Sequence, residues 1–197
     1  FNGAWPRVAS HPAAKFMVMA LVFYAAATTE GSLMAVKTVN SLSHYTDWTV
    51  AHVHSGAIGW VAMITIGSLY AMAPRALGRP AMHSKRSMEL HFWMHTAGLI
   101  LYVAAMWTAG VTEGLMWRAT DANGALIYPF IDSLIAVRPF YLIRFLGGLL
   151  IVGGMIAMAW NLWHTAADAR ARLIKPIPVP IPEPEPLQVP APVAARA

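Results

Sequence analysis

The sequence predicts an all-α integral membrane protein with four transmembrane helices. Hydrophobic residues make up 57% of the chain and charged residues only 12%, about half the charged share of an ordinary soluble domain. Four apolar stretches are long enough to cross a hydrocarbon core of about 30 Å, which takes about 20 helical residues. Because lipid offers no hydrogen bonds to the backbone, each stretch is expected to be helical.

The expected spans cover residues 16–36, 49–72, 90–111 and 140–163. Basic residues gather before the first span, between the second and third, and after the fourth: Arg7, Lys15, Arg75, Arg79, Lys85, Arg86, Arg170, Arg172 and Lys175. By the positive-inside rule these segments and both chain ends face the cytoplasm. The formal charge of +5 therefore reflects loop topology, and no nucleic-acid partner is expected.

The expected organisation is a cytoplasmic segment over 1–15, a four-helix transmembrane haem-binding segment over 16–165 and a cytoplasmic proline-rich tail over 166–197. Proline occupies nearly every second position of the tail, which excludes helix and favours extended polyproline II, with partner docking as a possible role. The start at Phe1, without a targeting segment, suggests a portion of a longer protein. The lack of cysteine excludes disulfides and thiolate metal sites.

Two histidines, His52 and His54, lie within the second span. Ionisable residues inside a span are costly and indicate function. Residues two apart on a helix point about 200° away from each other, so the pair cannot easily share one metal ion. Each can instead present a nitrogen to a separate haem iron, because neutral imidazole is a common axial ligand. The alternative is a pair of buried histidines bonded to neighbouring helices.

Glu30 is the acidic residue of the first span. At a rise of about 1.5 Å per residue it lies about 9 Å below the outer end of its span, and His52 about 5 Å below the outer end of the next. A carboxylate at this depth can accept the second ring N–H of an axial histidine and make it more electron-donating. Glu30 is therefore a candidate catalytic residue that acts through His52. A carboxylate facing a water pocket or proton route is the alternative.

Three further sites carry weaker predictions. His44, in the outer loop beside Asp47, is a candidate partner of haem propionates, although an ordinary interfacial loop has the same composition. Arg144 either reaches the membrane interface or pairs with an acid or propionate. His91 and His95 have the i, i+4 spacing of metal-binding helices. Because they lie at the cytoplasmic end of their span without a third ligand, we expect interfacial histidines that no metal bridges.

These residues form motifs that resemble a known family. The motifs are SHYTDWT at 43–49, HVHSGA at 52–57, TIGSLY at 65–70, HFW at 91–93 and GLMWRA at 114–119. Together they resemble the catalytic subunit of cbb3-type cytochrome c oxidases, the C-family of haem–copper oxidases. The resemblance covers residues 5 to about 165, and its double-histidine block is highly specific. His95 departs from the family pattern, in which a small or apolar residue is usual.

The resemblance implies that the chain is the last four spans of a twelve-span bundle in a bacterial inner membrane. It implies that His52 is the proximal ligand of a high-spin haem b and that His54 ligates a low-spin haem b. It also implies that Glu30 forms a hydrogen bond with His52. His44 matches a propionate-side residue. The copper ligands and the second low-spin ligand belong to earlier spans of the family.

The implied reaction is reduction of oxygen to water with proton translocation. Its implied partners are the rest of the catalytic subunit, membrane-anchored c-type cytochrome subunits and cytochrome c. Three alternatives stay open: a nitric oxide reductase, in which non-haem iron replaces copper, a haem-free proton-coupled transporter bundle, and a non-catalytic di-haem cytochrome. Metal analysis, a Soret band and oxygen consumption would separate them.

Overall fold

A computed structural model describes residues 3–174 of the chain, so the prediction for the proline-rich tail lies largely outside the described residues. Within this range the chain is helical and has no β-strand beyond one isolated bridge between Thr120 and Leu126. In chain order the elements are α1 (Trp5–Ser10), α2 (Pro12–Met34), α3 (Lys37–Ser43), α4 (Asp47–His54), the π-helix η1 (Ser55–Ala62), α5 (Met63–Ala76), α6 (Lys85–Arg118) and α7 (Phe130–Ile174).

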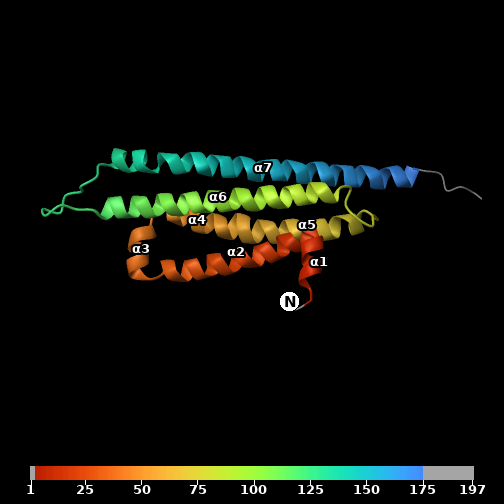
Figure 1. Ribbon diagram of the computed structural model, residues 1–197, viewed down its shortest axis with the longest axis horizontal. Coiled ribbons are helices and arrows are strands. Elements are labelled where there is room, and N and C mark those ends of the chain that lie inside the picture. Colours follow the sequence, from red (N-terminus) through yellow and green to blue (C-terminus); the bar gives the residue numbers. More distant parts are fainter. Residues whose placement is uncertain (1–2, 175–197) are drawn as a thin grey trace, which may run out of the picture.

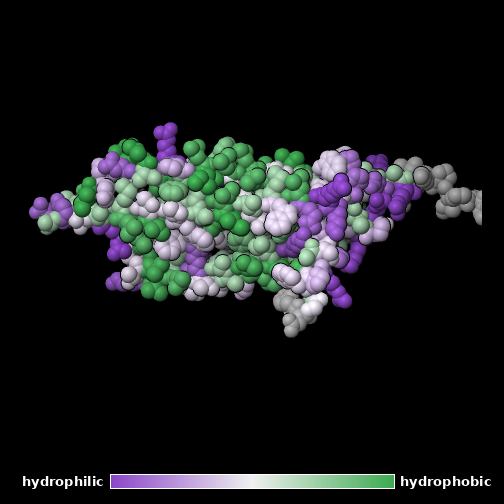
Figure 2. All heavy atoms as spheres, viewed as in Figure 1, coloured by the Kyte–Doolittle hydropathy of each residue, from purple (hydrophilic) through white to green (hydrophobic). Residues whose placement is uncertain are grey.

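Four helical stretches are long and apolar enough to cross a membrane, which confirms the predicted fold class. They are Pro12–Met34, Asp47–Ala76, Lys85–Arg118 and Phe130–Arg172. The second consists of α4, η1 and α5 in direct succession. The long helices run side by side along the molecule, with α6 between α7 and the α4–α5 stretch (Figure 1). Hydrophobic residues form a broad central band, and hydrophilic residues gather where α7 ends and α6 begins (Figure 2).

The connections expected on the outer side are more ordered than the sequence predicts. The expected 37–48 loop contains the short helix α3, and the expected 112–138 loop shrinks because α6 continues to Arg118 and α7 begins at Phe130. α7 also retains Pro139 inside it and extends to Ile174, so part of the expected tail is helical. Hydropathy indicates only the part of a helix that lipid surrounds. The helix itself continues into the interface as long as its backbone N–H and C=O groups are hydrogen-bonded.

The core lies along α6. One buried cluster joins α2, α5 and α6 through residues that include Phe16, Met63 and Phe92. A second joins α4, α6 and α7 through residues that include Leu99, Met106 and Val137. Helices α6 and α7 approach at a pair of glycines, since a Cβ on Gly98 would lie 2.5 Å from the carbonyl oxygen of Gly147. Such small-residue contacts let helix backbones approach closely in membranes.

This close approach predicts that Gly98→Ala destabilises the bundle. The added methyl group has to push α7 away, and overpacking of this kind costs about 1–3 kcal/mol. Gly148→Ala, one residue past the contact on α7, meets no atom within 4 Å and is the matched control. Thermal unfolding of the purified protein should show a lower midpoint for Gly98→Ala alone. Equal midpoints for the two variants would contradict the tight α6–α7 contact.

Candidate functional site

The first turn of α4 is fixed by two hydrogen bonds from outside the helix. The hydroxyl of Thr46 accepts the backbone N–H of Trp48 at 3.3 Å, and the Glu113 carboxylate on α6 accepts the N–H of Asp47 at 2.8 Å. These are two of the N–H groups that a helix start leaves without a partner. The bond from Glu113 ties the start of α4 to α6, and it sets the position of the histidines in the last turn of α4.

The rings of His52 and His54 lie against different helices, as their spacing predicts. His52 faces α2, where its Nδ1 lies 3.5 Å from Oε2 of Glu30. A Cβ on the neighbouring Gly31 would lie 3.1 Å from Cε1 of the same ring. His54 faces α6, where its Nε2 lies 3.3 Å from the hydroxyl of Tyr102.

One ring nitrogen of each histidine faces an oxygen acceptor, within hydrogen-bond distance for His54 and at 3.5 Å without a hydrogen bond for His52. Nδ1 of His54 lies 2.7 Å from the carbonyl oxygen of Val50. Because a carbonyl only accepts, Nδ1 carries the proton and Nε2 keeps its lone pair. Nδ1 of His52 points at a carboxylate, which likewise leaves its Nε2 as the nitrogen able to bind a metal ion.

The helix changes geometry directly after the two histidines. Residues Ser55–Ala62 form the π-helix η1, although the sequence predicts an uninterrupted α-helical span. π-helical stretches are rare and frequently occur at functional sites. Ser55 is buried, and its hydroxyl donates to the carbonyl oxygen of Ala51 at 2.9 Å.

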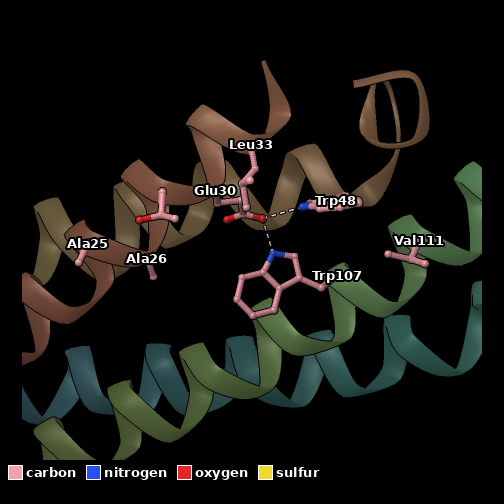
Figure 3. Close-up of a pocket in the computed structure, with 8 residues that line it drawn as sticks. Ala25, Ala26, Glu30, Leu33, Trp48, Trp107 and Val111 are labelled. Atoms are coloured by element: carbon pink, nitrogen blue, oxygen red, sulfur yellow. Dashed lines mark hydrogen bonds between the residues drawn. The ribbon is translucent and has the colours of Figure 1, made fainter. Parts of the chain in front are cut away.

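Two tryptophans hold the Glu30 carboxylate in place (Figure 3). The indole N–H of Trp48 donates to Oε1 of Glu30 at 2.7 Å, and that of Trp107 donates to the same oxygen at 2.6 Å. Oε2 is buried and forms no hydrogen bond among the described residues. The two indoles thus fix one oxygen, and the other is directed toward His52.

The sequence gives little indication of this arrangement. From the sequence alone Trp48 is an interfacial aromatic anchor, and Trp107 is one of several tryptophans in apolar surroundings. The signal that could have identified both is chemical, because an indole N–H within an apolar span needs an acceptor. Glu30 is the acidic residue of the first span, and it offers two acceptor oxygens.

His44 and Arg144 differ in how closely they join the site. The side chain of His44 is exposed, and its ring centroid lies 4.0 Å from that of Tyr45. Arg144 lies 4.0 Å from Oδ1 of Asp47 and 4.6 Å above the ring of Tyr141. Of the two roles expected for Arg144, the structure favours pairing with an acid.

The prediction that His91 and His95 are interfacial is wrong. Their exposed fractions are 0% and 1%, because α2, η1 and α7 pack over this part of α6. Nδ1 of His91 lies 2.9 Å from the hydroxyl of Tyr70, and Nε2 of His95 lies 3.3 Å from the carbonyl oxygen of Ile58. Residues 3–174 contain no group of three or more His, Cys, Asp or Glu side chains that could hold a metal ion. That no metal bridges this pair stays a prediction.

Comparison with known proteins decides the family. The profile of the family described as Cytochrome C and Quinol oxidase polypeptide I matches residues 1–150. The chain belongs to this family. It is 49% identical to the cbb3-type cytochrome c oxidase subunit CcoN1 of Stutzerimonas stutzeri, over 86% of this chain and 36% of that protein. It is also 49% identical to cytochrome c oxidase subunit 1 of Rhodobacter capsulatus, over 84% of this chain and 31% of that protein.

The resemblance to cbb3-type oxidases is thereby confirmed, and the chain spans about a third of the length of these relatives. Likeness to the alternative enzyme is weaker. A nitric oxide reductase polypeptide of Stutzerimonas stutzeri is 25% identical, over 66% of this chain and 28% of that protein.

The Glu30 arrangement predicts that Trp107→Phe destabilises the protein. Phenylalanine keeps most of the ring and removes the N–H, which costs a hydrogen bond to a charged group, about 1.5–3 kcal/mol. Trp117→Phe is the matched control, because the Trp117 indole donates at 3.2 Å to the neutral hydroxyl of Ser133. Its loss should cost about 0.5–1.5 kcal/mol. Chemical unfolding of both variants measures these losses in the free energy of unfolding. A larger loss in Trp117→Phe than in Trp107→Phe would contradict a charged Glu30 acceptor.

Proposed function

We propose that this chain is part of the catalytic subunit of a terminal respiratory oxidase that reduces oxygen to water with electrons from cytochrome c. The observation that carries the proposal is the pair of histidines on one helix whose rings face different helices, each with its Nδ1 facing an oxygen acceptor. The 49% identity to a cbb3-type oxidase subunit supports it.

In this proposal His52 is the proximal ligand of a high-spin haem b. The residues fit the group, because Nδ1 of His52 and Oε2 of Glu30 are both buried without a hydrogen-bond partner among the described residues and lie 3.5 Å apart. A modest ring movement would join them, and Nε2 would be left for the iron. Glu30 then acts as a positioning residue that strengthens electron donation by His52.

His54 is proposed as an axial ligand of a low-spin haem b. Its Nδ1–H donates to the Val50 carbonyl, which fixes the tautomer that a ligand bound through Nε2 requires. Binding of iron at Nε2 would replace the hydrogen bond to the Tyr102 hydroxyl. Tyr102 would then line the site instead of occupying the ligand position.

When bound, the haems would carry electrons and activate oxygen together with copper, whose ligands we assign to parts of the subunit outside this chain. The residues of this chain hold and orient the two imidazoles on a short stretch of backbone. That arrangement keeps the two cofactor positions on opposite sides of one helix. His44, exposed before α4, is proposed to contact a haem propionate.

The proposed setting is a bacterial cytoplasmic membrane, with the chain end that follows α7 in the cytoplasm and with proton translocation by the complete enzyme. The partners are the rest of the catalytic subunit and membrane-anchored c-type cytochrome subunits. The basic residues that follow the inner helix ends support this orientation. Nitric oxide reduction is the second candidate. Metal analysis of the intact complex decides between the two, because copper indicates the oxidase and additional iron indicates the reductase.

The ligand assignment predicts that His54→Ala in the complete subunit abolishes the low-spin haem spectrum and blocks electron entry. Alanine leaves α4 helical but removes the imidazole nitrogen that the helix presents toward Tyr102. Tyr102→Phe is the control, because it removes a hydrogen bond to His54 without removing the ligand, and its low-spin spectrum should persist. Optical spectra of the reduced protein test this. A normal low-spin band in His54→Ala would refute the assignment.

The pairing of Glu30 with His52 predicts that Glu30→Gln raises the potential of the high-spin haem and slows turnover. Glutamine keeps the size and can still accept a hydrogen bond, but it removes the negative charge that favours the ferric state. The low-spin potential should stay nearly unchanged, because His54 leaves the opposite face of α4. A redox titration that resolves both haems is the measurement. An unchanged high-spin potential with slowed proton-coupled steps would indicate a proton-relay acid instead.

A further inference from the structure

A second group of buried polar side chains lies nearer the cytoplasmic end of the bundle. It consists of Tyr70 on α5 with His91 and His95 on α6, and we call it the tyrosine–histidine cluster. The exposed fractions of the three residues are 2%, 0% and 1%. None of them belongs to the proposed haem site.

Each histidine of the cluster has one nitrogen bonded and the other buried without a partner. His91 uses Nδ1 toward Tyr70, and His95 uses Nε2 toward the carbonyl oxygen of Ile58 in η1. Nε2 of His91, Nδ1 of His95 and the hydroxyl of the adjacent Thr96 are all buried without a hydrogen bond among the described residues. Buried polar atoms in native proteins are almost always paired with protein or ordered water.

The missing partners are chemically complementary. A carbonyl only accepts, so Nε2 of His95 carries the proton and Nδ1 is an acceptor when the ring is neutral. If the Tyr70 hydroxyl donates to Nδ1 of His91, Nε2 of His91 is a donor. The two ring centroids are 5.6 Å apart, and the two nitrogens share no direct hydrogen bond. One water molecule can accept from His91 and donate to both His95 and Thr96, which gives it the usual three partners.

From this geometry we infer that the tyrosine–histidine cluster binds a water molecule between His91 and His95 and acts as a proton-holding site. A proton that arrives from cytoplasmic water at the Tyr70 oxygen releases the Tyr70 hydroxyl proton to Nδ1 of His91. Nε2 of His91 then passes its proton to the water, and the water passes one to Nδ1 of His95. One proton enters, one is gained by His95, and Tyr70 is neutral before and after.

Aromatic and apolar groups pack around the cluster. From α2, the centroid of the Phe16 ring lies 4.9 Å from that of His91 and 6.2 Å from that of His95. Lys15 of α2 is paired at 2.7 Å with Glu89. From α7, Gly154 lies against the His91 ring and brings no charge. Protonated His95 would still donate to the carbonyl of Ile58, which lies one turn beyond His54.

The site is tested by pH-difference infrared spectroscopy of the complete oxidase complex with isotope-labelled histidine. The wild-type protein should show an imidazole protonation band, a tyrosine band that Tyr70→Phe removes, and a water O–H band that shifts in oxygen-18 water. His95→Leu should lose the imidazole and water bands. None of these signals depends on haem, and the Soret band of the same samples reports failure of the proposed haem function separately.

A glycine pair tests the geometry without removing any titratable group. A Cβ on Gly154 would lie 2.8 Å from Cδ2 of His91, whereas a Cβ on Gly148 of the same helix meets nothing within 4 Å. Gly154→Ala should therefore displace the His91 ring and abolish the water band, and Gly148→Ala should keep it. If the oxidase complex with His95→Leu does not assemble, the comparison of Gly154→Ala with Gly148→Ala tests the proposal by itself. A water band absent from the wild type, or unchanged in His95→Leu or Gly154→Ala, would overturn the proposal.

Discussion

The spacing of two residues between His52 and His54 is the constraint on which the rest of the site depends. On a helix it turns the two imidazoles about 200° apart, so one ring reaches α2 and the other reaches α6. Nδ1 of each ring then faces its own oxygen, Oε2 of Glu30 at 3.5 Å for His52 and the Val50 carbonyl at 2.7 Å for His54. Because we propose both imidazoles as haem ligands, this turn of helix has to be held firmly. The bond from Glu113 to the start of α4 and the packing along α6 provide that support.

The helices α4 and α6 also stabilise the charge of the Glu30 carboxylate. A negative charge in an apolar span is costly unless it is hydrogen-bonded. Trp48 and Trp107 donate to the same oxygen, which stabilises the charge and leaves the other oxygen for His52. The tryptophans come from α4 and α6, so the carboxylate of α2 joins three helices at the depth of His52. The same contacts therefore contribute both to folding and to the orientation of His52.

Much of the fold and of the proposed site can be predicted from the sequence, because the sequence signals for these features are local. Apolar stretches fix the four spans, helix geometry separates His52 from His54, and matching depths bring Glu30 to His52. What the sequence does not reveal depends on packing between distant segments. The burial of His91 and His95 requires the covering helices, the π-helix η1 has no distinct sequence pattern, and Trp107 looks like any other aromatic residue of a span. The sequence underestimates the lengths of α6 and α7, because hydropathy indicates the part of a helix that lipid surrounds and not the residue at which the helix ends.

The most direct test of the account is anomalous diffraction at the iron edge from crystals of the complete subunit. The account predicts two separate iron peaks on opposite sides of α4, one bonded to Nε2 of His52 and the other to Nε2 of His54, with Nδ1 of His52 hydrogen-bonded to Glu30. A single peak shared by both rings, iron at only one of the two imidazoles, or no iron at either would contradict it.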